Sequence, residues 1–467
     1  MRAVVLTDGE RSSKGLDALL SQLERYGYDV DRGPNASRGL RDLNICWGGR
    51  PAAADAPGLV INPPDAVLRS LSPSESAVYL TWHGIPVPWE LIPQEVARPV
   101  NRPPDDEFVT LRVHVADLEV LKVEDDEQGA TIASLSRWRY ERMMEAACRS
   151  VYVLGLHFGC VHLRVHPKGA WHVERVDPHP NVDEALGLAY GQAIARLASV
   201  YHDKEWVLRE VTLGADPEFS LATDDGRILY ASRYLPYRGE VGYDRQSWER
   251  RGTVYPLAEI RPAPSPSPLV LANNVGRALE KARALLPTAR TRWMAGSNPL
   301  ARVPTGGHVH ISGVPLTTPL LLALDTYVAV PFMLLEKRTR AKQRRRRYGR
   351  LGDFRRKEHG GFEYRTLPSW LVSPSAAKAA LCLVKTVATE WPRLPLAPMR
   401  SAGAIREFYL GKKSRFRRIF PQAWRRVLAT PTAGLYAYEL AYVRRMVLGE
   451  QEWNDDDDIK RAWWQRS

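Results

Sequence analysis

Four short stretches of this 467-residue chain each carry two polar or charged side chains at positions i and i+2, flanked by apolar residues. The pairs are Asp216/Glu218 in GADPEF, Glu259/Arg261 in LAEIRP, His308/His310 in GGHVH and Glu363/Arg365 in FEYR. Because successive side chains of a strand point to opposite faces, each pair lies on one face of its strand.

Several carboxylates with a histidine form an oxygen-rich site that suits Mg²⁺ or Mn²⁺. Arginines suit phosphate, because the guanidinium group binds phosphate oxygens in a bidentate way. Together these residue types predict a nucleoside triphosphate site for phosphoryl transfer.

The alternative for any single pair is the solvated face of an ordinary strand, which is the commoner origin of such a pattern. Four pairs in motifs bounded by glycine and proline are harder to explain in this way. We therefore favour a binding site for the set as a whole.

The elements that position these pairs begin near Trp206. Strands with alternating polarity are separated there by longer helical patterns, such as 268–286 and 376–390. This arrangement predicts an α+β domain built on a largely antiparallel sheet, over residues 204–450. The apolar stretch 319–335 contains Asp325 and Pro331, which favours a buried helix over a membrane span. Residues 451–467 carry an acidic run, and we expect a polar surface tail there.

Several of these motifs resemble one known family. GADPEF, LAEIRP, GGHVHISG, YGRLGDFR and GFEYRTLPSWL, in this order, resemble the phage-type carboxylate–amine ligases, an amidoligase family with a glutamine-synthetase-like fold. The resemblance covers about residues 206–390. It implies an enzyme that uses ATP and Mg²⁺ (or Mn²⁺) to activate a carboxylate as an acyl phosphate. The activated group is then joined to an amine to form an amide or isopeptide bond.

The resemblance also implies roles for individual residues. Metal ligands would be Asp216, Glu218, Glu259, His308 and Glu363. Arg355 and Arg365 would face the phosphates of ATP and the acyl phosphate, and with Glu363 they form the expected catalytic set. We also expect His310 to contact nucleotide, and Arg347 is the member of the basic run 337–350 that we would place near the active site. Arg261 either belongs to the site or pairs with a neighbouring carboxylate.

The basic run 337-KRTRAKQRRRRYGR-350 leaves three interpretations open: contact with nucleotide or an anionic substrate, the solvated end of a helix, and contact with nucleic acid. We favour nucleotide contact, because the run leads directly into YGRLGDFR. Two other functions remain as alternatives to the ligase. One is a non-catalytic nucleotide- or nucleic-acid-binding protein that uses this run, and the other is a metal-dependent hydrolase.

The first region, 1–203, resembles an ATP-grasp chain in INPPDAV, in WHGIPVPWELIP and in the stretch from 154 to 180. The residues that ATP-grasp enzymes use are altered. His162 stands where those enzymes have an acidic residue, and Arg175-Val176-Asp177 replaces Glu-x-Asn. Between Pro99 and Val113 there is little room for a lysine-bearing nucleotide subdomain. We expect a catalytically inactive ATP-grasp-like α/β domain that serves as a scaffold or recruits substrate, with an unrelated α/β domain as the alternative.

The composition is that of an ordinary globular protein, with 44% apolar and 25% charged residues. Four widely spaced cysteines exclude a disulfide framework or a CxxC zinc site, and with a start that lacks the pattern of a signal peptide they indicate the cytoplasm. The net charge of +13 suggests an acidic substrate, such as a glutamate-containing peptide or a cell-wall fragment. The partners we expect are therefore ATP, a carboxylate donor and an amine acceptor, with neither nucleic acid nor a membrane among them.

Overall fold

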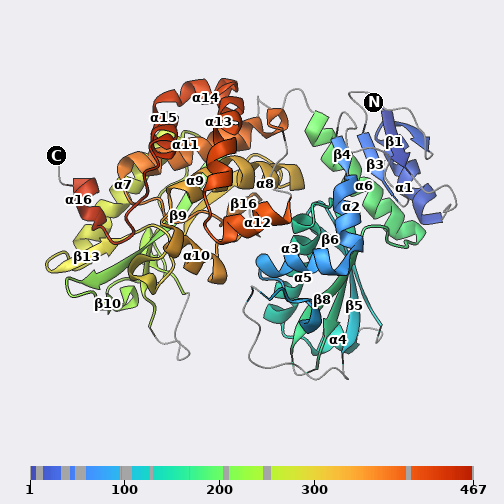
Figure 1. Ribbon diagram of the computed structural model, residues 1–467, viewed down its shortest axis with the longest axis horizontal. Coiled ribbons are helices and arrows are strands. Elements are labelled where there is room, and N and C mark those ends of the chain that lie inside the picture. Colours follow the sequence, from blue (N-terminus) through green and yellow to red (C-terminus); the bar gives the residue numbers. More distant parts are fainter. Residues whose placement is uncertain are drawn as a thin grey trace. The chain divides into compact units, whose positions relative to one another are not determined.

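The computed structural model divides into two compact units, Met1–Lys204 and Glu205–Ser467 (Figure 1). It describes residues 2–6, 14–32, 43–47, 59–94, 96, 108–126, 130–167, 169–202, 210–245, 254–358, 360–395 and 401–464. The domain boundary that we expected at 203/204 falls in the stretch 203–209, outside the described residues.

Unit 1 (Met1–Lys204) begins with a parallel sheet of order β2-β1-β3-β4. Its strands are β1 (Arg2–Leu6), β2 (Asp29–Arg32), β3 (Leu43–Cys46) and β4 (Leu59–Ile61). Helices α1 (Lys14–Arg25) and α6 (Glu184–His202) pack closely against each other. Glycines allow this approach, since a Cβ atom on Gly187 would lie 2.0 Å from the carbonyl oxygen of Gly15. The core beneath them includes Leu19, Ile45 and Tyr190.

A second, antiparallel sheet of unit 1 has the order β6-β5-β7-β8. Its strands are β5 (Val109–Ala116), β6 (Glu119–Asp125), β7 (Phe158–Val165) and β8 (Trp171–Asp177). The remaining elements are α2 (Pro64–Leu71), α3 (Pro73–Trp82), the 3-10 turn η1 (Trp89–Leu91), α4 (Ala130–Ser134) and α5 (Arg137–Val153). Unit 1 is thus a mixed α/β structure. Between Pro99 and Val113, where we expected too little room for a nucleotide subdomain, the residues up to 107 lie outside the described residues.

Unit 2 (Glu205–Ser467) is built on an antiparallel sheet of order β11-β12-β9-β14-β16-β15, with β10 and β13 also paired to β9. The strands are β9 (Thr212–Thr223), β10 (Ile228–Leu229), β11 (Val241–Tyr243), β12 (Leu257–Ile260), β13 (Thr291–Met294), β14 (Gly307–Ser312), β15 (Phe354–Arg356) and β16 (Phe362–Tyr364). Strands from distant parts of the sequence are therefore neighbours, and all four i, i+2 pairs lie on or beside this sheet.

Helices cover one face of that sheet, and α7 (Pro268–Leu285) and α11 (Pro374–Glu390) pack against each other above it (Figure 1). The apolar stretch forms one buried path through α8 (Thr318–Leu324), a π-helical turn η5 (Asp325–Ala329) and α9 (Val330–Leu335). By length and composition Thr318–Leu335 could span a membrane, but 94% of it is buried inside the protein. It is therefore a core helix, as Asp325 and Pro331 indicate.

The other elements of unit 2 are short turns and the C-terminal helices. They are η3 (Ala231–Arg233), η4 (Pro299–Ala301), η6 (Trp391–Arg393), α10 (Arg338–Arg347), α12 (Ala402–Tyr409), α13 (Ser414–Leu428), α14 (Pro431–Leu435), α15 (Ala437–Leu448) and α16 (Ile459–Trp464). Helix α13 is amphipathic and buries Phe416, Phe420 and Trp424.

The expectation of a polar tail at 451–467 is wrong for the described part of that segment. Asp455 is fully buried, and its Oδ2 atom accepts hydrogen bonds from the backbone N–H groups of Ser297 (2.7 Å) and Asn298 (2.8 Å). Asp456 accepts from the N–H of Leu300 at 3.0 Å, and Trp453 is buried. These carboxylates therefore accept hydrogen bonds from backbone N–H groups of the segment that precedes β14. A sequence pattern does not show which backbone N–H groups require an acceptor.

Candidate active site

The register of the unit 2 sheet places the predicted residues side by side on one face. Glu259 of β12 is opposite Glu218 of β9, Asp216 of β9 is opposite His308 of β14, and His310 is opposite Glu363 of β16. Arg355 of β15 is opposite Glu363 on its other side. We call Asp216, Glu218, Glu259, His308, His310 and Glu363 the site cluster.

The opposite face of the same strands points toward the helices. Phe219 and Val309 are buried there, and the hydroxyl of Tyr364 donates a hydrogen bond to Asp325 Oδ1 at 2.7 Å. Alternation along each strand therefore separates an apolar, helix-covered face from the face that bears the site cluster.

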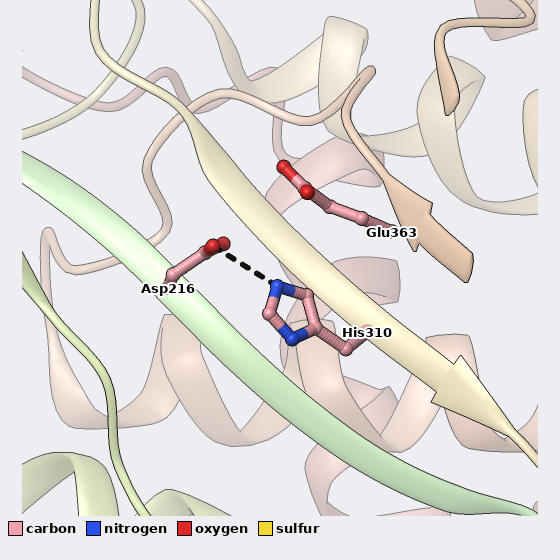
Figure 2. Close-up of side chains that lie close together, drawn as sticks. All are labelled: Asp216, His310 and Glu363. Atoms are coloured by element: carbon pink, nitrogen blue, oxygen red, sulfur yellow. Dashed lines mark hydrogen bonds and ion pairs between the residues drawn. The ribbon is translucent and has the colours of Figure 1, made fainter. Parts of the chain in front are cut away.

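Three members of the site cluster have metal-ligand spacing. One ligand atom each from Asp216, His310 and Glu363 lies within 4.8 Å of the other two. Figure 2 shows these side chains approaching one another from three strands, with the Nε2 atom of His310 3.0 Å from Asp216 Oδ2. Among the described residues this is the one group of three or more such side chains with that spacing. His310, which we expected to contact nucleotide, therefore has the spacing of a ligand.

His308 lies deeper in the same cluster. It is 3% exposed, and its Nδ1 atom lies 3.4 Å from both Asp216 Oδ1 and Glu363 Oε1. Its Nε2 atom is 3.2 Å from the Tyr348 hydroxyl. Contacts with His308 and His310 outweigh the cost of burial and hold the pKa of Asp216 well below its usual value.

Glu218 and Glu259 form a second acidic pair beside these residues. Glu218 is 1% exposed, and its Oε2 atom accepts from Gly306 N–H at 2.7 Å and from the Tyr348 hydroxyl at 2.8 Å. Burial, with the nearby carboxylates of Asp244 and Glu259, raises the pKa of Glu218 well above its usual value. Burial and Asp216 raise the pKa of Glu259 to about 8. Arg261 forms an ion pair with Glu259, which is the second of the two roles considered for it.

Glu363 carries most of the cationic contacts of the site. Its carboxylate is 1% exposed; Oε1 lies 3.1 Å from Arg365 Nε, and Oε2 lies 3.4 Å from Arg355 NH1 and 2.6 Å from Lys357 Nζ. Burial opposes ionisation of Glu363, but the charges of His308, Arg365 and Arg355 keep its pKa below the usual value. The two arginines named from the sequence thus lie beside the cluster.

The two glycines before His308 are required by close packing. A Cβ atom on Gly306 would lie 1.9 Å from the Tyr348 hydroxyl oxygen, and one on Gly307 would lie 2.4 Å from the carbonyl oxygen of Pro368. The Gly-Gly pair therefore admits Tyr348 into the cluster and lets β14 pass close to the segment after β16.

No single one of the three interpretations offered from the sequence covers the whole basic run 337–350. Arg344 is fully buried and donates to the carbonyl oxygens of Thr305 (2.9 Å), Thr366 (2.8 Å) and Leu367 (2.5 Å). Arg345 is buried in an ion pair with Glu336. These two arginines are structural, whereas Arg347 is exposed and its nucleotide contact stays a prediction.

Sequence reasoning missed Tyr348 and Lys357. Tyr348 lies in the YGRLGDFR motif, and Lys357 lies two residues after Arg355, which puts it on the same strand face. The same i, i+2 spacing could therefore have predicted that Lys357 lies at the site. The role of Tyr348 depends on a contact across 130 residues, which the sequence alone does not indicate.

The site cluster fits a divalent cation. Asp216 Oδ1, Glu218 Oε1 and His308 Nδ1 are buried side-chain atoms without a hydrogen-bond partner. Buried polar atoms are normally hydrogen-bonded, so Asp216 Oδ1 and His308 Nδ1, which lie 3.4 Å apart without a hydrogen bond, are suitable ligands for Mg²⁺ or Mn²⁺.

Unit 1 offers no comparable group within its described residues. At the end of β8, Asp177 Oδ1 accepts from the N–H of His179 at 2.9 Å, and Asp177 Oδ2 is 3.8 Å from Arg175. These contacts describe an acidic turn with internal partners.

Comparisons with known proteins give one family. The model of the family described as phage phiEco32-like COOH.NH2 ligase-type 2 matches residues 213–465, which is more than half of the chain. No curated protein matches the sequence.

Solved structures similar to the N-terminal part of the chain are ATP-grasp proteins and related ligases. The macrocyclase MdnC with precursor peptide MdnA from Microcystis aeruginosa MRC is 12% identical and has a TM-score of 0.31, covering 42% of this chain and 99% of its own. An ATP-grasp RimK domain protein from Sphaerobacter thermophilus DSM 20745 is 14% identical with a TM-score of 0.31, covering 42% and 99%. The D-alanine–D-alanine ligase from Aeromonas hydrophila is 13% identical with a TM-score of 0.32, covering 44% and 100%.

Proposed function

The chain belongs to the phage phiEco32-like COOH.NH2 ligase-type 2 family, and we propose that it activates a carboxylate as an acyl phosphate with ATP and joins it to an amine. The observation that carries this proposal is the site cluster, which lies inside the matched span 213–465 with Arg355 and Arg365 beside it. We also propose a glutamine-synthetase-like fold for unit 2, supported by its antiparallel sheet and by the order of its motifs.

The residues divide the work as follows. A bound Mg²⁺ or Mn²⁺ supplies charge neutralisation for the phosphates of ATP. Asp216, Glu363 and the imidazoles would hold that ion, because one ligand atom each of Asp216, His310 and Glu363 lies within 4.8 Å of the other two. Arg355 and Arg365 bind phosphoryl oxygens and stabilise the negative charge that spreads over them during transfer. Glu218 and Glu259 form the buried floor beside these ligands, and because their pKa values are raised, a bound cation would favour loss of their protons.

The substrates follow from this chemistry at the level of class. A carboxylate is a poor electrophile, and phosphorylation gives it a leaving group that an amine can displace. The net charge of +13 favours an acidic carboxylate donor, and we propose a glutamate-containing peptide or a cell-wall fragment.

The test is formation of hydroxamate from ATP, Mg²⁺, hydroxylamine and a mixture of amino acids and acidic peptides. Hydroxamate that requires both ATP and Mg²⁺ supports the ligase, and chelation of the metal should abolish it. ATP hydrolysis that persists across all donors without hydroxamate would favour a hydrolase instead.

Glu363→Ala is the decisive variant, because it removes the carboxylate that contacts three cations and His308. We expect metal-dependent ATP turnover to fall by at least about 100-fold, the usual scale for loss of a metal ligand or its oriented partner. The matched control is Glu358→Ala, an exposed glutamate in the same hairpin. Turnover retained in Glu363→Ala would contradict the proposed site.

A further inference from the structure

Lys357 is the closest cationic contact of Glu363. It follows β15 directly, two residues after Arg355, and its Nζ atom is 2.6 Å from Glu363 Oε2. The Lys357 side chain is 22% exposed, whereas Glu363 is 1% exposed. The lysine thus reaches from a hairpin at the sheet edge to a buried carboxylate.

The hairpin holds the lysine backbone in place. The N–H of Lys357 donates to the carbonyl oxygen of Gly361 at 3.2 Å, and the N–H of Gly360 donates back to Lys357 at 3.2 Å. Gly360 and Gly361 both have φ of +81°, a conformation that glycine adopts without steric cost. The stem of the lysine is flexible, but its starting point is fixed.

The other cations of the site are placed differently. Arg365 lies between Glu363 and Asp353, 3.7 Å from the latter, and is 15% exposed. Arg355 is 53% exposed and 3.4 Å from Glu363. A lysine ammonium is a compact point charge on a flexible four-carbon stem, so Lys357 can leave Glu363 and return.

Glu363 is also a member of the group with metal-ligand spacing, with Asp216 and His310. A divalent ion held by Glu363 binds a carboxylate whose Oε2 atom already lies 2.6 Å from the Lys357 ammonium. Two cations so close repel each other strongly in a buried site. Binding of the ion therefore requires the ammonium to withdraw.

We infer that the Lys357 ammonium occupies the Glu363 carboxylate in the metal-free site and competes with the divalent cation for that carboxylate. This inference rests on the proposed use of a divalent cation at the site cluster. Because an anionic phosphate offers the withdrawn ammonium a new partner, the competition couples binding of the ion to binding of the nucleotide.

The experiment measures Mn²⁺ binding to the full chain without nucleotide, by electron paramagnetic resonance of free Mn²⁺ and by calorimetry. In Lys357→Gln the competing charge is gone, and we expect the Kd for Mn²⁺ to fall about tenfold, a change of about 1.4 kcal/mol. Lys357→Arg keeps a cation, so its Kd should not fall below that of the wild type.

The matched control is Arg356→Gln. It removes the same charge at the neighbouring position, whose side chain alternates to the opposite face of the strand. Its Kd for Mn²⁺ should stay within about twofold of the wild type. An equal fall in Arg356→Gln and Lys357→Gln would overturn the inference, because net charge alone would then explain it.

Other outcomes are equally decisive. An unchanged or raised Kd in Lys357→Gln with a native circular dichroism spectrum overturns the inference. Should Lys357→Gln not fold, a lowered Kd in Lys357→Arg would still overturn it. Measuring Mn²⁺ binding does not require catalytic turnover. A tenfold fall in the Kd for Mn²⁺ without any hydroxamate formation would therefore support the inference about Lys357 and contradict only the proposed ligase activity. Active ligase with an indifferent Lys357 contradicts only this inference.

Discussion

Tyr348 connects the two acidic parts of the site cluster at the scale of single atoms. Its hydroxyl donates to Glu218 Oε2, so the hydroxyl oxygen accepts from Nε2–H of His308. If a divalent ion replaced the positive charge of His308, the Nδ1 atom of the neutral ring would present its lone pair to the region between Asp216 and Glu363. A phenol thereby fixes the tautomer that a metal ligand needs.

Tyr348→Phe tests this arrangement. We expect the Kd for Mn²⁺ to rise about 10- to 100-fold, as for other partners that orient a ligand. Loss of the two buried hydrogen bonds of the hydroxyl should also lower the free energy of unfolding by about 1–3 kcal/mol. Mn²⁺ titration and urea unfolding measure the two effects. Tyr438→Phe, at a side chain that is 88% exposed, is the control. Unchanged Mn²⁺ binding in Tyr348→Phe would show that His308 is oriented by other contacts.

At this scale the i, i+2 spacing predicted which residues share a sheet face, because alternation is a local property of a strand. The spacing could not predict which of His308 and His310 is more deeply buried. Both point to the same face, and their depth depends on which strands flank β14. The partners of the site cluster also depend on contacts between segments far apart in the chain, such as Tyr348 with Glu218.

At the scale of secondary-structure elements, helix α10 shows that arginines of a basic run can hold neighbouring segments together. The guanidinium of Arg344 bridges three carbonyl oxygens, one before β14 and two after β16. It therefore joins the segments that flank the His308 and Glu363 strands. A lysine cannot reproduce this planar fork.

Arg344→Ala should lower the free energy of unfolding of unit 2 by about 3 kcal/mol or more, because it leaves buried carbonyls without donors. Arg344→Lys should recover only part of this loss. Urea unfolding followed by tryptophan fluorescence measures the change. The exposed neighbour provides the comparison, since Arg346→Ala should change the free energy by less than about 0.5 kcal/mol. Equal effects at the two positions would mean that the run acts through its total charge.

The type of a secondary-structure element was easier to predict from the sequence than the contacts that its side chains make. The periodicity at 268–286 and 376–390 corresponds to α7 and α11, and the apolar run at 319–335 corresponds to a buried helical path. The acidic run at 455–458 was misjudged for a physical reason. Its carboxylates accept from backbone N–H groups of the 293–300 segment, and backbone donors carry no signature in the sequence.

At the scale of the whole molecule, the two units differ in the side chains that could bind a metal ion. In the described residues the group with metal-ligand spacing lies in unit 2, within the span that matches the ligase family. Unit 1 has His162 and Arg175-Val176-Asp177 at the positions where the resemblance to ATP-grasp chains led us to expect an acidic residue and Glu-x-Asn. We therefore propose that unit 2 performs catalysis and that unit 1 is a scaffold or recruits substrate.

Asp177→Asn tests this division of labour in the full chain. If the end of β8 held a working metal site, loss of its charged oxygen would lower ATP turnover by about 10-fold or more. We expect a change of less than about twofold instead, because an asparagine oxygen can still accept the hydrogen bond from the His179 N–H. Asp216→Asn in unit 2 is the matched change and should reduce turnover by at least about 100-fold, since it alters a carboxylate that faces both histidines. A large loss in Asp177→Asn, with both variants folded, would assign catalysis to unit 1 as well.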